Sequence, residues 1–193
     1  MIKFQIKEIF EVRTGALLNR VKSAQETPLK TKAFNLRSVE KSVIDRENID
    51  VIYLKKIISD EFYSKEGDIL FKIVSPYSTY YVDKNYEDIL VPSNFFILRL
   101  KKKFQNDVIP EYVSYILNSK EILFEIKKIQ QGNAAVISLK KTYLENFEIN
   151  IPDIEKQKKY SEFYRALAIR NNLLKQKLNL NEEYFQNVIG KFF

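Results

Sequence analysis

A heptad repeat in the last fifth of the chain limits most strongly what this sequence can fold into. Between Asp153 and Val188, the spacing of the seam positions alternates between four and three residues. An apolar position about every 3.5 residues is typical of a helix that packs along a partner helix as a coiled coil. No proline or glycine interrupts the run before Gly190. The seam positions are Tyr160, Tyr164, Leu167, Asn171, Leu174, Leu178, Asn181, Phe185 and Val188, of which only the two asparagines break the apolar rule.

The length of this repeat indicates a helix that extends beyond the domain preceding it. Such a helix would be roughly 50 Å long, too long to bury its whole seam along one small domain. We therefore expect a rod that dimerises with a second copy of the chain. The alternative is an amphipathic helix that folds back on its own core. Because Pro152 stops the preceding pattern and Asp153 can serve as an N-cap, we place the boundary between a domain of residues 1–152 and a helix of residues 153–193.

The composition excludes several classes of protein. The 193 residues include no cysteine and no histidine, which excludes disulfides, thiolate metal sites and the commonest general base. Uncharged apolar runs are only a few residues long, far short of a membrane-spanning helix. The first residues lead directly into patterned sequence with no apolar signal core. We therefore expect a cytoplasmic protein without a membrane segment.

The charges are distributed unevenly along the chain. The net charge is +7, and residues 1–59 alone have a net charge of +5. The segment 13–37 contains six cations and a single carboxylate, Glu26. A local excess of this kind suits a polyanion better than a uniformly solvated surface. The alternative is a generally lysine-rich composition, which explains scattered lysines better than it explains the three arginines of this segment.

The pattern of residues 1–152 predicts an α+β fold. The runs 69–74 and 77–82 follow a Gly67-Asp68 turn and should pair as a hairpin, and Pro110 favours the start of a helix. We predict a twisted, mainly antiparallel sheet or small barrel plus helices, followed by the long C-terminal coiled-coil helix. The other expected elements are a strand or short helix at 4–12, a long polar loop at 13–39, a short strand within 51–58, a strand at 95–100, helices from 111 and at 121–130 with Gly132 as the end of the second, and a strand at 147–151.

Four stretches occur in a particular order: 11–15 (EVRTG), 65–71 (KEGDILF), 93–100 with 109–119, and 131–149 followed by Ile151, Pro152 and Gln157. In order and spacing they resemble the specificity subunit of type I restriction–modification systems. Two places depart from that family. Residues 72–77 read KIVSPY where many relatives have Arg-Gly-Ser or similar, and Asn133 stands where relatives often have Thr. Both lie in loops where sequence specificity varies.

The resemblance implies a DNA reader rather than an enzyme. In that family one target-recognition domain reads one half of a bipartite site in double-stranded DNA. The helix after it packs antiparallel against its counterpart and fixes the separation of the halves. A full subunit has two of each, so this chain resembles a half-subunit that pairs with a second copy or with another half-subunit. Methyltransferase and restriction subunits are the further partners that the resemblance implies.

No catalytic or cofactor site is expected. The sequence lacks the Asn-Pro-Pro-Tyr-like tetrapeptide and Gly-rich turn of an adenine methyltransferase, and it lacks a P-loop. The residues that come nearest to a nuclease motif are Glu125 and Lys127 with Asp107 upstream. Glu125 and Lys127 fall in a helical pattern, where residues two apart do not face each other. We therefore predict no catalytic residue, no metal and no cofactor.

The candidate DNA contacts are mainly basic side chains in polar segments. Lysine and arginine contact phosphates, and Arg, Asn, Gln and Lys can read base edges. For each candidate the alternative is a solvated surface residue, and Tyr80 could instead pack across strands. The alternative function is a protein-interaction module that dimerises through its C-terminal helix without reading DNA. The candidates are Arg13, Arg20, Lys22, Arg37, Lys72, Tyr77, Tyr80, Asn133, Lys140 and Lys141.

Overall fold

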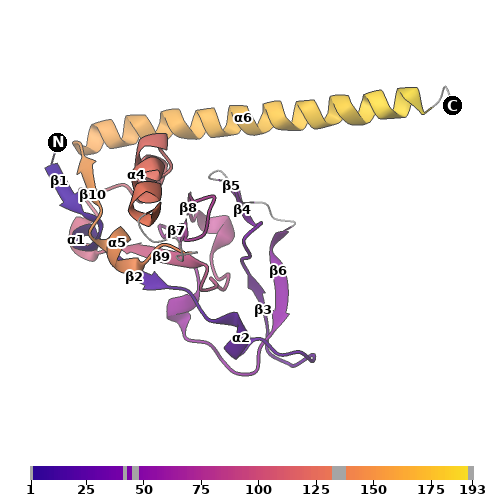
Figure 1. Cartoon of the computed structure of the whole chain (residues 1–193), viewed down its shortest axis with the longest axis horizontal. Coiled ribbons are helices and arrows are strands. Elements are labelled where there is room, and N and C mark those ends of the chain that lie inside the picture. The colour runs from indigo at the N-terminus through magenta and orange to yellow at the C-terminus, as the bar shows by residue number, and fades with distance from the viewer. Residues whose placement is uncertain (1, 41–42, 45–47, 132–137, 191–193) are drawn as a thin grey trace.

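The computed structural model describes residues 2–40, 43–44, 48–131 and 138–190, and a four-stranded antiparallel sheet lies at the centre of the domain (Figure 1). In sheet order its strands are β2 (Phe10–Thr14), β9 (Phe95–Leu100), β7 (Ile69–Lys72) and β8 (Ser78–Tyr81). The predicted hairpin is the pair β7–β8. None of the described sheets closes into a barrel, so the α+β prediction is confirmed in its open-sheet form.

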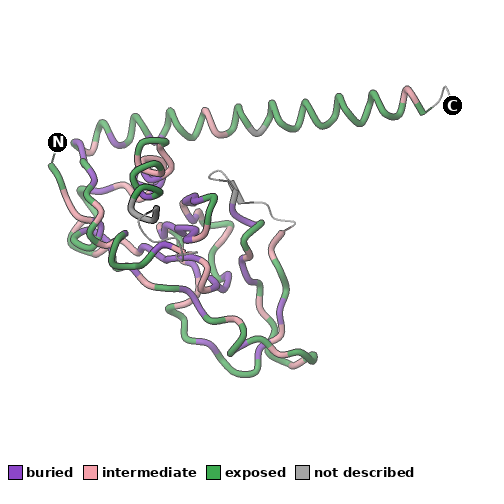
Figure 2. Tube along the Cα trace, viewed as in Figure 1, coloured by how far each residue is buried: buried purple, intermediate pink, exposed green. Residues whose placement is uncertain are grey.

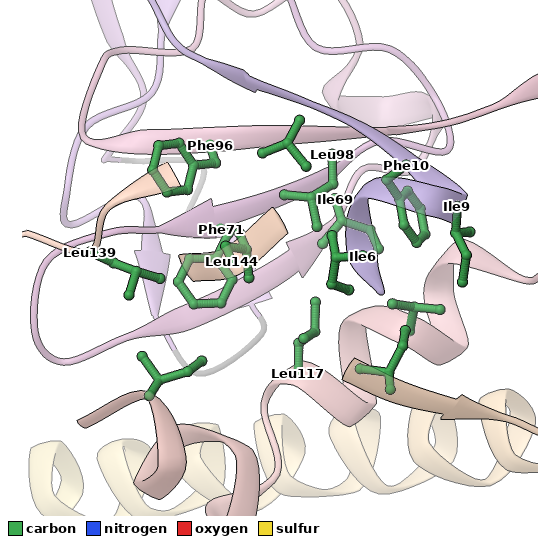
Figure 3. Close-up of a cluster of buried hydrophobic side chains, with 14 of the residues drawn as sticks. Ile6, Ile9, Phe10, Ile69, Phe71, Phe96, Leu98, Leu117, Leu139 and Leu144 are labelled. Carbon is green, nitrogen blue, oxygen red and sulfur yellow. The ribbon is translucent and has the colours of Figure 1, made fainter. Parts of the chain in front are cut away.

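Both faces of the central sheet are buried. Along β7, Ile69 and Phe71 belong to one core and Leu70 belongs to another. Figure 3 shows the first core, in which side chains from α1 (Ile6–Ile9) and from α3 (Pro110–Leu117) surround β7. A strand buried on both faces has a continuous apolar run, which is why β7 was recognisable in the sequence.

Smaller elements surround this sheet. β1 (Ile2–Gln5) pairs with β10 (Glu148–Ile151), so the two ends of the domain meet. β3 (Lys30–Ala33) pairs with β6 (Asp50–Tyr53), and β4 (Val39–Glu40) pairs with β5 (Val43–Ile44). The remaining helices of the domain are α2 (Leu18–Val21), α4 (Lys120–Gln131), α5 (Lys141–Glu145) and the 3-10 turns η2 (Asp60–Phe62), η3 (Lys84–Tyr86) and η4 (Lys102–Phe104).

Several stretches differ from the prediction. Residues 4–12 form parts of a strand, a helical turn and a second strand. The predicted loop at 13–39 contains α2 and β3, and residues 57–58 lie outside β6. β3 was missed because Lys30 and Lys32 face solvent and only Ala33 is buried, which leaves too weak an apolar period to detect. The predicted helix end at Gly132 lies outside the described residues.

α6 (Ile154–Ile189) is one helix of 36 residues, as the heptad repeat predicted. The Asp153 carboxylate caps it by accepting a hydrogen bond from the backbone N–H of Lys156 at 3.0 Å. The first turns pack on α3, and the helix then continues past the domain with nearly every described side chain exposed (Figures 1 and 2). At 1.5 Å per residue it is about 54 Å long. The base of α6 therefore packs on its own domain, as one alternative expected, and the rest of the helix is exposed, whereas its pairing with a second copy stays a prediction. No helix in the described part of the chain, α6 included, is both long and apolar enough to cross a membrane.

Gly15 is packed so closely against backbone that a side chain there should disturb the fold. A Cβ at this position would lie 2.3 Å from Pro92 O and 2.4 Å from Val91 O. We expect Gly15→Ala to lower the free energy of unfolding by about 2–3 kcal/mol, because the backbone must shift. The control is Gly190→Ala, where the nearest atom is Gln186 O at 3.3 Å, and its effect should stay within about 1 kcal/mol. Urea denaturation measures both, and equal stabilities would contradict this packing.

Candidate nucleic-acid interface

A small separate core supports the part of the domain that contains β3, β6 and α2. We call this part, residues 16–33 and 50–63, the β3–β6 lobe. Backbone hydrogen bonds from Leu54 N to Leu29 O (2.8 Å) and from Ser23 N to Tyr53 O (2.7 Å) place β6 between β3 and the residues after α2. Figure 1 shows α2 on the side of the domain away from α6. The buried residues of this core are Ala16, Val21, Ala33, Ile52, Leu54, Ile58 and Leu90.

Cationic side chains cover the outside of this lobe and its surroundings. Successive side chains of a strand point to opposite faces, so Ala33 faces the core, and Lys30 and Lys32 point away from it. At the end of the helical turn α2, Val21 is buried while its neighbours Arg20 and Lys22 are exposed. We call these cations, together with three others nearby in the sequence, the basic surface. Its members, all exposed, are Arg20, Lys22, Lys30, Lys32, Arg37, Lys55 and Lys56.

The charges of the basic surface are not neutralised within the described part of the chain. None of its members forms an ion pair with a described carboxylate. The lobe also exposes Glu26 and Asp50, so it has an excess of cations rather than cations alone. Such an excess attracts a polyanion, and Lys and Arg side chains are the usual partners of nucleic-acid phosphates. The basic surface is therefore the best candidate for a nucleic-acid interface.

A hollow of about 400 Å³ lies beside Arg20 and Lys56. Its apolar lining includes Leu17, Phe62 and Ile57, and Ile57 is 83% exposed. Apolar side chains next to cations suit contact with thymine methyl groups or base faces beside phosphates. The sequence analysis missed Lys55, Lys56 and Ile57, although the adjacent lysines directly after an apolar run were a signal for them.

Arg13 has a different environment from the other predicted contacts. Its guanidinium donates to Glu61 at 2.6 Å and to Glu11 at 2.7 Å. The hydrogen bond from Arg13 holds the pKa of the Glu11 carboxyl below its usual value. Two carboxylates therefore balance this arginine, which ties β2 to η2 rather than adding to the basic surface.

The structure places Lys72, Tyr77 and Tyr80 in the interior, with exposed fractions of 6%, 6% and 8%. Tyr80 stands opposite Leu70 in the neighbouring strand, and its hydroxyl donates to Asp83 at 3.1 Å. Burial raises the pKa of the Tyr80 hydroxyl. Packing across strands was the alternative that the sequence left open for Tyr80, and its position opposite Leu70 agrees with it. The burial of Lys72 was not expected, because a lysine is typical of a surface. We leave these three out of the proposed interface.

The remaining predicted contacts do not join the basic surface. Lys140 and Lys141 are exposed at the start of α5, and Lys141 lies 3.4 Å from the carboxylate of Glu145. Figure 1 places α5 beside α1 and β10, away from β3 and β6. Asn133 lies outside the described residues.

The described residues contain no group of three or more carboxylates arranged to hold a metal ion. Glu125, the best nuclease imitation in the sequence, forms an ion pair with Lys128 at 2.8 Å. The excess of cations on the basic surface thus suits binding of an anion.

No family model matches the sequence. Solved structures do match the fold. The crystal structure of the HsdS subunit from Thermoanaerobacter tengcongensis matches with a TM-score of 0.65 at 14% sequence identity, over 91% of this chain and 44% of that chain. A structure that describes complex assembly and conformational transition of the type I R-M system gives the same values. The type I restriction–modification S subunit from M. genitalium matches with a TM-score of 0.54 at 12% identity, over 92% of this chain and 41% of that chain.

The chain has the fold of a type I specificity subunit. It spans less than half the length of the three chains that it matches. Residues from the stretches that suggested this family make buried contacts within the fold. Asp68 binds Arg99 through two hydrogen bonds, and the Asn118 amide binds the backbone of Thr79. The resemblance therefore lay in residues that hold the specificity-subunit fold together, whereas every member of the basic surface lies outside those stretches.

The basic surface should supply phosphate contacts. We expect the double reversal Arg20→Glu, Lys22→Glu to weaken binding to duplexes of any sequence, and the slope of log K against log salt to fall by about one unit per lost contact. The double reversal Lys102→Glu, Lys103→Glu makes the same change of net charge in η4 and is the control. Fluorescence anisotropy over a salt series measures both. Equal losses in the two variants would show a net-charge effect and contradict a defined interface.

Proposed function

We propose that this chain is a sequence-specific DNA-recognition subunit of a type I restriction–modification system. The observation that supports this most directly is a basic surface that forms no ion pair among the described residues, on a domain joined to a long helix with an exposed apolar seam, in the fold of a specificity subunit. Residues 1–152 would read one half of a bipartite site, and α6 would set the separation of the halves. The chain would act on DNA in the cytoplasm without a cofactor or a reaction of its own.

The exposed seam of α6 supports pairing with a second copy. Leu174, Leu178 and Phe185 are 47%, 60% and 60% exposed, and their burial against a partner helix would be the driving force for association. The two seam asparagines, Asn171 and Asn181, would fix the register of an antiparallel pair at some cost in stability. Leu167 and Val188 lie at the two ends of this free part.

The base of the seam already has a partner within the chain. Tyr160 stacks on Tyr112 with ring centroids 6.1 Å apart, and Tyr164 stacks on Tyr115 at 5.2 Å. Both α6 tyrosines remain partly exposed. In the proposed dimer they would border the interface, whose main part begins at Leu167.

A second apolar strip on α6 supports docking of methyltransferase subunits against the rods. Ile169, Leu173, Leu180 and Tyr184 are exposed and follow one another at intervals of four, seven and four residues, which places them along one side of the helix. Leu173 and Leu174 are neighbours in sequence and so project about 100° apart. A partner on the second strip would therefore leave the seam free for the second copy.

A protein-interaction module that dimerises without reading DNA would also use the exposed rod. It would not account for the basic surface. Methylome sequencing of cells that express this chain with its cognate methyltransferase separates the two functions. A new methylated bipartite site supports the DNA reader, and an unchanged methylome contradicts it.

The chain should be a dimer that depends on the seam. We expect Leu174→Asp, Leu178→Asp to give a monomer at tens of micromolar, because two charges in an apolar seam are not compensated. Lys175→Asp, Asn179→Asp introduces the same side chains on the polar side of α6 and should remain a dimer. Multi-angle light scattering measures the mass. A native monomer at this concentration would contradict the proposed pairing.

The spacer length and the base sequence of the half-sites should change independently. Deleting one heptad from α6, residues 171–177, shortens the rod by about 10 Å while keeping the seam in phase. We expect the methylome to show the same half-site letters around an altered spacer. A homodimer has two-fold symmetry, so the native site should be an interrupted palindrome. An asymmetric site for this chain acting alone would contradict the homodimer and indicate pairing with a different half-subunit.

A further inference from the structure

A buried glutamine attaches the base of α6 to the domain. The Gln157 side chain is fully buried. Its Nε2 donates to Asp107 O at 2.7 Å and to Pro152 O at 2.9 Å, and its Oε1 accepts from Ile109 N at 2.9 Å. The amide therefore links the start of α6 to the residues that lead into α3.

A second attachment lies eight residues further along α6. Arg165 Nε donates to Glu111 Oε1 at 3.0 Å, and its Nη2 donates to the other oxygen of the same carboxylate. Glu111 belongs to the first turn of α3, and its side chain is 11% exposed, against 57% for Arg165. The Tyr115 hydroxyl also donates to Glu111, at 3.2 Å. A guanidinium that binds both oxygens of a carboxylate fixes orientation as well as distance.

α3, which binds Arg165 directly and follows the residues that Gln157 binds, is itself tied to the central sheet. Asn118 Oδ1 accepts from Thr79 N at 2.8 Å, and Asn118 Nδ2 donates to Thr79 O at 2.8 Å. Thr79 lies in the edge strand β8, so this amide binds the sheet edge in the way a further strand would. Direct contacts thus run from the central sheet through α3 to α6.

Polar attachments at two separated points fix the direction of a rod, and here the stacks of Tyr160 on Tyr112 and of Tyr164 on Tyr115 add contacts between them. Gln157 and Arg165 are about 12 Å apart along the helix axis. α6 extends 32 residues beyond Gln157, or about 48 Å. A tilt of about 10° at Gln157 would displace the far end by about 8 Å, which exceeds two base-pair steps of about 3.4 Å.

We propose that Gln157 and the Glu111–Arg165 ion pair are positioning residues that set the separation at which two paired recognition domains meet DNA. This inference rests on the proposed function. Gln157 holds the pivot of α6, and the ion pair holds its angle. Neither belongs to the basic surface, so both act on the spacer and leave the half-site letters unchanged.

The geometry can be measured without DNA. The sequence has no cysteine, so a chain with Lys30→Cys and Gln186→Cys accepts exactly two spin labels, one on the lobe and one near the end of α6. Diluting it with unlabelled chain leaves only the distance within one molecule. We expect pulsed electron–electron double resonance to show a single narrow distribution of distances between the two labels. In Arg165→Gln this distribution should be about twice as broad, because the helix could then rotate about its base.

Two further variants keep the test informative. Glu111→Gln, Arg165→Gln removes the ion pair without leaving a buried charge unpaired, and it should broaden the distribution to the same extent. Lys158→Gln is the matched control, because within the described part of the chain Lys158 pairs only with Glu155 on the same helix, at 2.9 Å. Its distribution should equal that of the native chain.

The consequence for DNA is read from a library of duplexes in which the half-sites found by methylome sequencing are separated by spacers of varied length. We expect Arg165→Gln to accept a wider range of spacers while its affinity for a single half-site stays unchanged. A purely stabilising role would lower the melting temperature without widening the range. Unchanged distance distributions in both ion-pair variants would overturn the inference, and so would broadened distributions with unchanged spacer selection. A native chain that binds no bipartite duplex would instead overturn the proposed function, and with it the effect on the spacer.

Discussion

An ion pair between Arg99 of β9 and the buried Asp68, the residue before β7, holds the central sheet in the register on which the rest of the structure depends. Asp68 stands opposite Arg99, one step beyond the Ile69–Leu98 pair. Arg99 Nε and Nη2 donate to its two carboxylate oxygens at 2.8 and 2.7 Å, and the Asp68 side chain is 2% exposed. The hydrogen bond to Asp68 raises the pKa of Arg99. A slip of one residue would separate the two charges inside the protein and would turn the side chains of β7 toward the wrong cores.

From this sheet, separate contacts lead to two surfaces with different chemistry. The β3–β6 lobe is joined through Leu90, whose backbone N–H donates to Lys32 O at 2.9 Å and whose carbonyl accepts from Phe34 N at 3.0 Å. The rod is joined through α3. These two connections use different residues, so the charge of the lobe and the direction of the rod depend on different parts of the chain. In the proposed function, this separation lets one part determine which bases are read and the other how far apart they lie.

How far the sequence predicts this structure depends on how strongly one physical signal dominates each segment. α6 was predictable because 36 residues repeat one period, and Asp153 marks its start. β7 was predictable because burial on both faces leaves a continuous apolar run. β3 was not, because it buries one side chain and exposes two lysines, a pattern shared with polar loops. The interior position of Lys72 was hidden for a related reason: which strand ends are covered depends on packing between segments far apart in the sequence, which no local pattern contains. The same limit applied to Arg13, whose partner Glu61 lies 48 residues away.

The division of α6 into an attached base and a free rod restricts the geometry of the proposed antiparallel pair. The seam is free from Leu167 onward, so two rods can overlap along about 33 Å, from Leu167 to Ile189. Adding the 15 Å or so from each Gln157 to its Leu167 places the two bases about 63 Å apart, less than two turns of DNA at about 34–36 Å each. Figure 1 shows β3 and β6 beneath the middle of α6 rather than beyond its base. In an antiparallel pair the two lobes therefore point toward each other, and their basic surfaces lie closer together than the bases. The separation of the two half-sites would then be smaller than the distance between the two bases, and so less than two turns of DNA.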